Sequence, residues 1–438
     1  MNQTIERTHW RYTGPLAALS GSERTSLLHR TGARSSLVRE RTEEIVRRVC
    51  LEGDRALREM ARAYDGVLLD SVEVPRAARL RALAGIDRTL RAALERAARN
   101  IEMVHAADPP RTVEVETEPG VMVGRRPDPL QRVGIYSPGG RAAYASSVLM
   151  CGIPARVAGV SEIVLCSPPQ KNGYPAPVVL AACEIAGVDR VFSVGGAGAI
   201  AAMAYGTESI PRVDKIVGPG NAYVAEAKLQ VSRDVAIDSP AGPSELLVLC
   251  DAGCDARTIG REVIAQAEHD SNACIVVVCL DEETTLAIAA GIEQSLPDAP
   301  RTDVIREALE QNGALFWANS ISDAVEFTNE FAPEHLLLAF EDAERVLPDI
   351  RNAGCVFVGE PSSVVFGDYI TGGNHVLPTG GLARSYSGLG TLDFVRWTSY
   401  QKVTRAAAQR LAADTAILAA AEGLPSHAAA ALCRSVQC

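Results

Sequence analysis

Two short polar stretches carry residue types that can do chemistry. The first is "AQAEHD" at 265–270, which lies between a segment of helical spacing and the apolar run "ACIVVVCL". Polar groups beside a buried strand must be paired or solvated, so they either cap a helix or hold something. In a helix, Gln266 and His269 would project from one face, and their oxygen and nitrogen atoms can bind a metal ion. The second stretch, "FAPEHLLLAF", pairs Glu334 with His335, a carboxylate beside an imidazole that can both transfer protons.

Two further polar stretches contain carboxylates and histidines. "FGDYITGGNHVLPTGG" holds Asp368 and His375, and its glycines predict a loop. "AAAEGLPSHAAAAL" holds Glu422 and His427, with Pro425 in the first turn of the last helix. A cap, a turn or a solvated face explains each stretch separately. Four of the seven histidines fall in these four stretches, however, which favours one shared site. A set of Gln, His, Asp and His donors would suit zinc.

Glycine-rich stretches in the middle of the chain suggest an anion site. "YSPGGRAAY" and "GPGNAYVAEAK" both place glycines just before a predicted helix, where free backbone N–H groups can meet a phosphate. Residues 196–201, "GAGAIA", fit the pattern GxGxxA after the strand "RVFSV". Close packing of a helix on a strand explains the same glycines.

The elements that must position these residues follow an alternating rhythm. From about residue 130, short apolar runs such as "EIVLCSPP" and "SELLVLCD" end in Gly, Pro or Ser and alternate with helical stretches. This rhythm predicts βαβ units and a mostly parallel sheet. Before it, "VEVETEP" and "VMVGRR" predict extended segments joined by a Pro-Gly turn. After residue 390 we expect the chain to be helical to its end.

We therefore predict an α/β fold with two incomplete Rossmann-like lobes. The expected division is a mainly helical N-terminal region at 1–128, a first lobe at 129–240, a second lobe at 241–388 and a helical tail at 389–438.

Composition narrows the class of protein. A net charge of −11 argues against a nucleic-acid-binding surface, and no polybasic run suits an anionic membrane. The N-terminal residues lack an apolar signal core, and no window is apolar enough to span a membrane, so we expect a cytoplasmic protein. The eleven scattered cysteines are expected to be small buried thiols.

Taken together, the motifs resemble those of the histidinol dehydrogenase family. The resemblance runs from about residue 35 to about 430 and includes "YSPGGRAAYASSVLM", "GPGNAYVAEAK", "AGPSELLVL", "QAEHD", "APEHL", "GDYITGGNHVLPT" and "AAEGLPSH", in the family's own order. It implies NAD-dependent oxidation of L-histidinol to L-histidine through an aldehyde. It also implies one zinc ion per subunit and a homodimer in which the tail completes the partner's active site.

The resemblance also assigns residues by motif. Glu334 and His335 match the acid–base pair, and Tyr136 and Asn221 match cofactor contacts. The remaining matches are zinc ligands at Gln266, His269, Asp368 and His427, and further substrate contacts at Ser244, His375 and Glu422. One departure is Gly198 in "GGAGAI", where the family usually carries a Gln that touches NAD. Our hypothesis is that His335 takes the alcohol proton and that Glu334 activates water for the aldehyde step.

Three other readings of the sequence stay open. A paralogous dehydrogenase of another amino alcohol or polar diol is compatible with Gly198 and with Ser239 before "PAGPSE". A zinc hydrolase would need an open metal position, which four protein ligands and the absence of HExxH disfavour. A silent zinc-binding scaffold is disfavoured by the intact Glu334 and His335.

Overall fold

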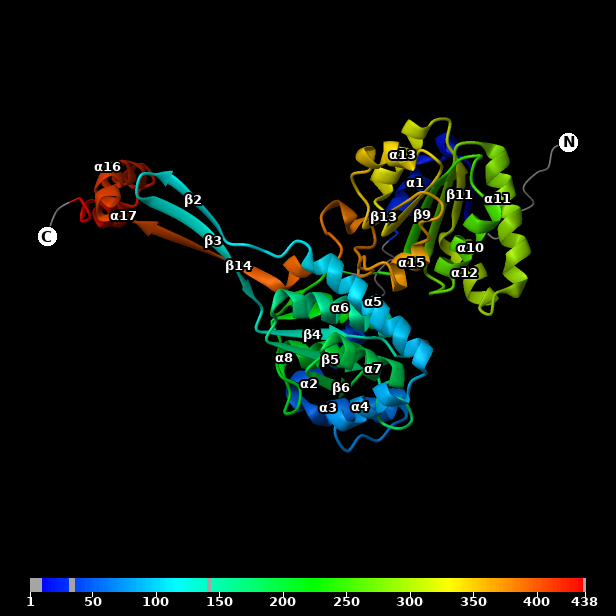
Figure 1. The fold of residues 1–438 in the computed structure, drawn as a ribbon, viewed down its shortest axis with the longest axis horizontal. Helices are drawn as coiled ribbons and strands as arrows, with labels where there is room; N and C mark the ends of the chain where they lie inside the picture. Colours follow the sequence, from blue (N-terminus) through cyan, green and yellow to red (C-terminus); the bar gives the residue numbers. More distant parts are fainter. Residues whose placement is uncertain (1–9, 31–35, 140–142, 241, 436–438) are drawn as a thin grey trace.

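The computed structural model describes residues 10–30, 36–139, 143–240 and 242–435. The chain forms two α/β lobes and a long arm that projects away from them (Figure 1). The predicted α/β class with two Rossmann-like lobes is therefore confirmed. Within the described ranges, no helix is long and apolar enough to cross a membrane.

The first lobe is built on a five-stranded parallel sheet in the order β6-β5-β4-β7-β8. In chain order this is 3-2-1-4-5, the arrangement of a doubly wound fold, and the direction of winding reverses between β4 and β7. The strands are β4 (Arg132–Tyr136), β5 (Glu162–Ser167), β6 (Arg190–Ser193), β7 (Lys215–Val217) and β8 (Ala236–Ile237).

Helices cover both faces of this sheet, because parallel strands need crossover connections. One face packs against α4, α5, α6 and α7, and the other against α2, α3, α8 and α9. Their bounds are α2 (Ser36–Glu52), α3 (Asp54–Met60), α4 (Arg76–Gly85), α5 (Arg88–Ala106), α6 (Ala145–Ala158), α7 (Pro177–Ala186), α8 (Gly196–Tyr205) and α9 (Ala222–Val231).

The second lobe contains a six-stranded parallel sheet in the order β1-β11-β10-β9-β12-β13. From β9 onwards it repeats the 3-2-1-4-5 order of the first lobe. Strand β1 extends this sheet by pairing with β11, whereas α2 to α5 pack on the first lobe. The described part of the predicted N-terminal region 1–128 thus contributes to both lobes, and its last residues form β2 and most of β3 in the arm. The strands are β1 (Tyr12–Pro15), β9 (Glu245–Cys250), β10 (Cys274–Cys279), β11 (Ala314–Trp317), β12 (His335–Ala339) and β13 (Cys355–Val358).

The helices of the second lobe enclose two apolar clusters, one on each face of the sheet. The strands between these clusters are buried on both faces, which explains their continuous apolar runs. The helices are α1 (Gly21–Leu28), α10 (Ala256–Ala267), α11 (Glu282–Ser295), α12 (Thr302–Asn312), α13 (Ile321–Phe331), α14 (Ala343–Val346) and α15 (Val364–Tyr369).

The arm consists of an antiparallel sheet in the order β14-β3-β2, followed by two helices. The hairpin of β2 (Val113–Glu118) and β3 (Val121–Pro129) confirms the extended segments predicted around a Pro-Gly turn. The prediction that the chain is helical after residue 390 is wrong over β14 (Val395–Val403), which precedes α16 (Arg405–Ala421) and α17 (Pro425–Leu432). None of the residues of β14 is buried, so its sequence lacks the apolar face by which a strand is recognised.

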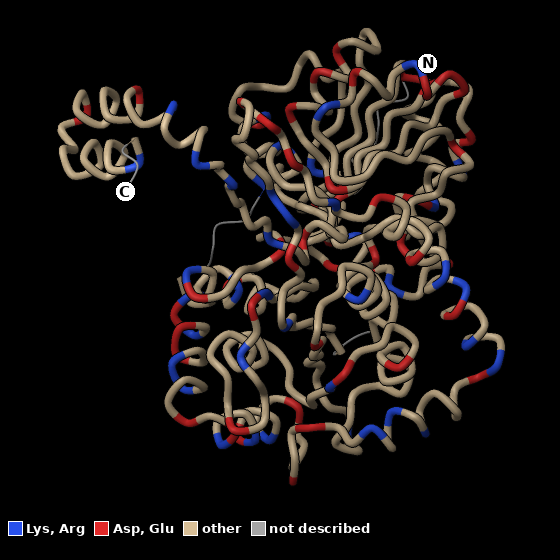
Figure 2. Tube along the Cα trace, turned by 60° about the vertical axis from the view of Figure 1, so that its left-hand side comes forward, with Lys and Arg blue, Asp and Glu red and all other residues tan. Residues whose placement is uncertain are grey.

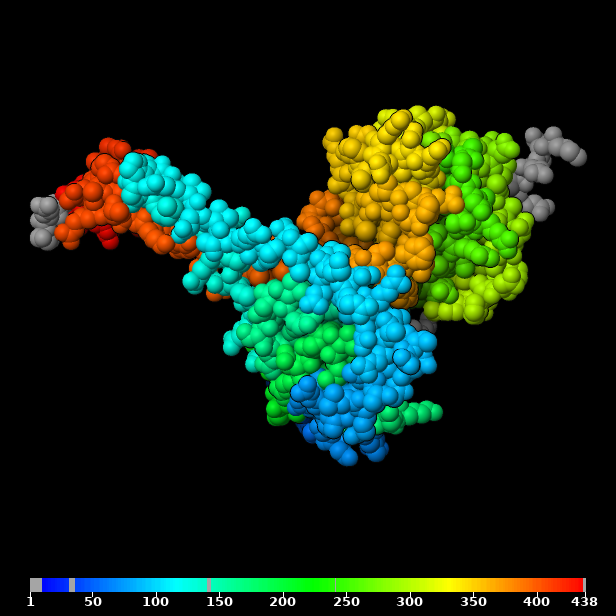
Figure 3. All heavy atoms as spheres, in the orientation of Figure 1, coloured from blue at the N-terminus to red at the C-terminus, as the bar shows by residue number. Residues whose placement is uncertain are grey.

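The arm exposes apolar as well as polar side chains to solvent. It stands clear of both lobes in the space-filling view (Figure 3). Val115 is 55% exposed, and Ile417 and Leu418 are 66% and 68% exposed. Acidic and basic residues are interspersed around the two lobes (Figure 2), as expected for solvated faces.

Candidate functional site

The predicted acid–base pair lies at the amino end of β12, where the parallel strands of the second sheet begin. Glu334 and His335 are 7% and 3% exposed. Glu334 Oε2 accepts a hydrogen bond of 2.7 Å from the backbone N–H of Glu245, the first residue of the neighbouring strand β9. His335 Nδ1 lies 3.0 Å from the Glu245 carbonyl oxygen, to which its protonated form would donate. His335 Nε2 is then directed at Asp368 Oδ1, 3.5 Å away.

Burial and charge act in opposite directions on this cluster. Burial alone lowers the pKa of His335, but the carboxylates of Glu334 and Asp368 outweigh it and hold the pKa well above its usual value. Burial raises the pKa of Glu334, a shift that His335 only partly offsets. Burial also raises the pKa of Asp368, yet the nearby rings of His335, His375 and His269 reverse this, and the pKa of Asp368 falls below its usual value. Burial thus disfavours the protonated ring of His335, and the two neighbouring carboxylates favour it more strongly.

The predicted zinc donors of the second lobe approach this pair from two helices. Gln266 lies in the last turn of α10, and its Nε2 is 3.3 Å from His335 Nδ1. His269 follows the end of that helix, and its buried Nδ1 has no hydrogen-bond partner among the described residues. Asp368 was expected in a loop but lies in the short helix α15, which includes Gly367 and ends at Tyr369, before Gly372 and Gly373.

These three side chains offer nitrogen and oxygen donors of the kind that zinc accepts. A buried ring nitrogen without a hydrogen-bond partner in the protein, as in His269, is available to bind a metal ion. Within the described residues of one chain, no group of three or more His, Cys, Asp or Glu side chains is placed to hold a metal. Among the described residues, His269 and Asp368 are therefore not joined by a further side chain of these four types as a ligand.

The remaining predicted donor lies on the arm. His427 occupies the first turn of α17, which begins at Pro425 as the sequence predicted, and Glu422 ends α16. Both are exposed. Figure 1 shows α16 and α17 at the tip of the arm, away from the lobes that carry Asp368 and His335. The structure therefore does not bring these two residues to the other site residues of the same chain.

His375 joins the two lobes. Its Nδ1 lies 2.8 Å from the Asp368 carbonyl oxygen, and its Nε2 lies 3.1 Å from Ser147 Oγ on α6. Ser244 immediately precedes β9, one residue before Glu245. Both thus lie at the edge that carries the acid–base pair.

The predicted cofactor residues lie where the strand order of the first lobe reverses. Tyr136 ends β4, and Asn221 follows β7 and caps α9 by accepting hydrogen bonds from the backbone N–H groups of Tyr223 and Val224. The Tyr136 hydroxyl accepts a 3.0 Å hydrogen bond from the N–H of Gly196, at the start of α8. Carboxyl ends of strands at such a reversal are the usual ligand site of doubly wound folds.

Gly198 lies on the buried face of α8. A Cβ atom there would lie 3.2 Å from Met60 Sδ and 3.5 Å from Leu57 Cδ2, so a side chain would start towards α3.

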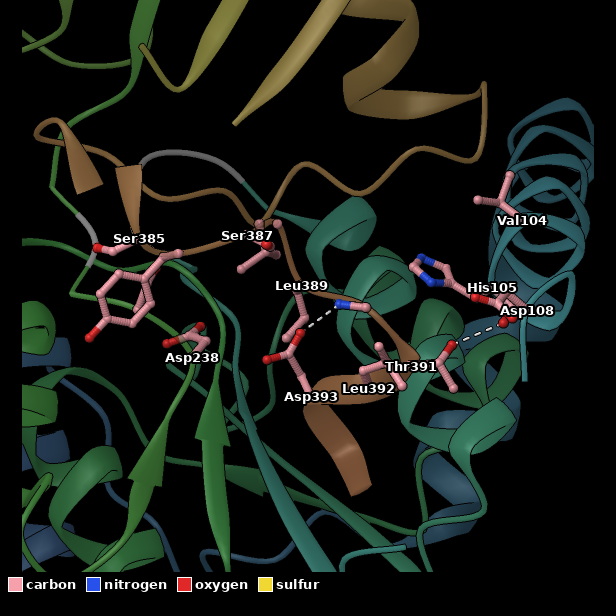
Figure 4. Close-up of a pocket in the computed structure, with 15 residues that line it drawn as sticks. Val104, His105, Asp108, Asp238, Ser385, Ser387, Leu389, Thr391, Leu392 and Asp393 are labelled. Carbon is pink, nitrogen blue, oxygen red and sulfur yellow. Dashed lines mark hydrogen bonds between the residues drawn. The ribbon is translucent and has the colours of Figure 1, made fainter. Parts of the chain in front are cut away.

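A pocket of about 510 Å³ lies between the end of α5 and the segment 385–393 (Figure 4). Asp238 and Ser239, just beyond β8, form another part of its wall. The residues predicted for chemistry lie outside this lining.

Four residues that contact site residues or hold their elements in place are not predicted by local sequence. Ser147 on α6 contacts His375 and lies within the quoted "YSPGGRAAYASSVLM", and Glu262 on α10 binds Ser363 and Val364 at the start of α15. Glu245 belongs to the quoted "AGPSELLVL" but reads as an ordinary strand start. Arg30 reaches Glu245 from the N-terminal segment, a pairing that no local pattern predicts.

The fold and site define a doubly wound α/β enzyme with a buried carboxylate–imidazole pair. Comparison with known proteins then gives the particular family. The family model described as histidinol dehydrogenase matches residues 28–435. The chain belongs to the histidinol dehydrogenase family and is an oxidoreductase of that kind.

Individual relatives are similar to this chain over most of their own length. The histidinol dehydrogenase of Methanosarcina mazei is 44% identical over 94% of this chain and 95% of its own, and that of Nitrosomonas europaea is 45% identical over 90% and 91%. The crystal structure of histidinol dehydrogenase from Elizabethkingia anophelis covers 98% of both chains with a TM-score of 0.92 and 35% identity.

Proposed function

We propose that this enzyme oxidises L-histidinol to L-histidine through L-histidinal, in two NAD-dependent steps at a zinc-containing site, as a cytoplasmic enzyme of histidine biosynthesis. The observation that carries the proposal is the buried pair Glu334 and His335 beside Gln266, His269 and Asp368. An amino alcohol with an imidazole ring offers two nitrogen ligands to a metal held by these donors.

Zinc would be held by Gln266, His269 and Asp368, with His427 of a second chain as the fourth ligand. When bound, it would orient the substrate, and fixing a reactant in productive geometry can lower a barrier by several kcal/mol. The carboxylate of Asp368, with its pKa below the usual value, is charged and ready to bind a cation.

NAD would lie at the carboxyl edge of the first lobe, near Tyr136 and Asn221. When bound, it would accept a hydride in each oxidation. The positive ends of the α8 and α9 dipoles both lie at this edge, which favours an anion such as a pyrophosphate. The usual Gln contact is replaced by Gly198, so the chain would bind the cofactor without it.

His335 and Glu334 would divide the proton transfers. In its neutral form, His335 holds a proton at Nδ1 towards the Glu245 carbonyl, which leaves Nε2 to take the proton of the substrate hydroxyl. Glu334 would then take a proton from the water that attacks the aldehyde. The oxyanion that this attack forms would take the proton held by His335, which could then accept a proton again as the resulting hydrate is oxidised.

The arm would exchange between two subunits. Its exposed apolar residues and the position of Glu422 and His427 far from the lobes support a homodimer in which each tail completes the partner's site. Glu422 would then contact the substrate bound by the other chain, together with Ser244 and His375.

The direct test is to supply L-histidinol and NAD, follow NADH, and quantify histidine before and after chelation. We expect two NADH per histidine, loss of turnover on chelation and recovery with zinc. A folded, zinc-loaded protein that produces no NADH from L-histidinol, but does so from another amino alcohol or diol, would overturn the assigned substrate.

A further inference from the structure

Glu334 is held by residue 245 in a reciprocal arrangement. The Glu245 N–H donates to Glu334 Oε2 at 2.7 Å, and the Glu334 N–H donates to Glu245 Oε2 at 3.3 Å. Each residue thus accepts the backbone N–H of the other with its carboxylate. The orientation of the Glu334 carboxylate therefore depends on the position of the Glu245 main chain.

The Glu245 carboxylate is in turn fixed by an arginine from the N-terminal segment. Arg30 donates from Nε to Glu245 Oε1 at 2.8 Å and from Nη2 to Oε2 at 2.6 Å, a two-pronged ion pair. The side chains of Arg30 and Glu245 are only 5% and 4% exposed. Glu245 Oε1 also accepts the N–H of Gly380 at 2.7 Å, so the carboxylate has partners on both oxygens.

Arg30 also holds the turn that delivers Glu334 to the strand. Its guanidinium lies 3.6 Å from the centroid of the Phe331 ring, and its Nη2 donates to the Ala332 carbonyl at 3.3 Å. Ala332 has φ of 50°, and it is the single residue other than glycine with positive φ in the described part of the chain. Such a conformation persists only where its surroundings enforce it.

We infer that Arg30 and Glu245 are positioning residues that hold the Glu334 carboxylate for the water step of the reaction. The inference rests on the proposed function for its kinetic consequence but on the contacts above for its geometry. The side chains of Glu334 and His335 both contact the main chain of residue 245, but Glu334 also donates its own backbone N–H to the Glu245 carboxylate. Loss of the ion pair should therefore affect Glu334 more than His335.

The kinetic test compares the two oxidations separately, with L-histidinol and with supplied L-histidinal. Glu245→Gln keeps the shape of the side chain and removes the charge, and Arg30→Lys keeps the charge but loses the fork. We expect each to lower kcat for aldehyde oxidation by about 100-fold with little change in KM, because a small displacement of a reacting group has that effect. Alcohol oxidation should fall much less. Equal loss in both oxidations would overturn the inference.

A double-mutant cycle separates positioning from general destabilisation. In a Glu334→Gln background, Glu245→Gln should cause no further loss of aldehyde oxidation, because the group it positions is already gone. Fully additive losses would overturn the inference. Arg79→Lys is the matched control, since Arg79 forms a similarly buried ion pair with Glu184 in the first lobe, and it should leave the ratio of the two oxidations unchanged.

Crystal structures of the wild type and of Arg30→Lys give a readout that does not need turnover. The Glu334 carboxylate should leave the Glu245 N–H in the variant and keep it in the wild type. An unmoved carboxylate would overturn the inference even if the enzyme proved inactive on histidinol. A wild type without activity on histidinol, but with the expected displacement in the variant, would instead overturn the proposed substrate alone.

Discussion

Glu262 accepts a hydrogen bond of 3.2 Å from the backbone N–H of Val364, and so joins α10, which carries Gln266, to α15, which carries Asp368. The Ser363 hydroxyl donates to the same carboxylate. The two helices that would share a metal ion are thus linked by one side chain behind the ligands. Such outer contacts orient the ligands, and their loss typically weakens metal binding.

Glu262→Ala should therefore weaken zinc binding without removing a ligand. We expect a loss in affinity of about 10- to 100-fold, measured by competition with a chromophoric chelator. Glu262→Gln, which still accepts the Val364 N–H, is the matched control and should lose less. Unchanged affinity in a folded Glu262→Ala protein would contradict the role of this link.

Substitution of His335 and substitution of Glu334 should lower the rates of the two oxidations to different extents. His335→Ala should damage both oxidations, by roughly 10² to 10⁴ in turnover if the residue acts as a general base. Glu334→Gln should damage aldehyde oxidation more than alcohol oxidation, because water is needed only there. Rates with L-histidinol and with supplied L-histidinal measure the two steps. Equal losses for Glu334→Gln would contradict the proposed division of labour.

Local patterns in the sequence predict the parts of the fold that are locally determined. The alternation of apolar runs and helices predicts both lobes, and the helical spacing before Gln266 correctly predicts α10. Strand β1 joins the sheet of the second lobe through a partner some three hundred residues away, a pairing that no periodicity contains. Strand β14 was missed because its exposed residues show no apolar face.

The site could be predicted only where its residues stand in polar stretches. His335 and Asp368 do, and the structure brings them within 3.5 Å of each other. Arg30 and Glu245 do not, because a buried ion pair between distant segments leaves no trace in either segment alone. The sequence thus predicts candidate residues for the chemistry, whereas the residues that hold these candidates in place can be found only in the fold.

Restoring the family's usual residue at position 198 should strain the first lobe. Since a Cβ there meets Met60 Sδ at 3.2 Å, Gly198→Gln should destabilise the fold by about 1–3 kcal/mol, as overpacking of a core does. Urea denaturation measures this change, and titration with NAD measures whether affinity improves. Adding Met60→Ala should relieve the strain. A Gly198→Gln variant as stable as the wild type would show that the core has room for this side chain.

The buried phenol of Tyr136 should make stability depend on alkaline pH. Burial raises the pKa of Tyr136 from 10 to about 12, although the Gly196 N–H partly opposes this. A raised pKa means that the stability is fully present below pH 10 and is lost as the pH rises towards 12. Between pH 9 and 11, the wild type should lose about 1 kcal/mol more than Tyr136→Phe, in urea denaturation at both values. Equal losses in the two proteins would contradict a buried neutral phenol.

Exchange of the arm can be tested by combining two inactive chains. His269→Ala lacks a donor on the lobes, and His427→Ala lacks the donor on the arm, so each homodimer should be inactive. In a mixed dimer with exchanged arms, one site combines the intact His269 of one chain with the intact His427 of the other. With random mixing on co-expression, about half of the dimers are mixed, and one of the two sites in each mixed dimer is intact. About one quarter of all sites, and so about one quarter of the wild-type activity, should then be restored. If each arm instead served its own chain, every site would lack one donor and the mixture would stay inactive. Co-expression of His269→Ala with Asp368→Ala is the control, since both lie on the lobes and no exchange of arms can complete a site.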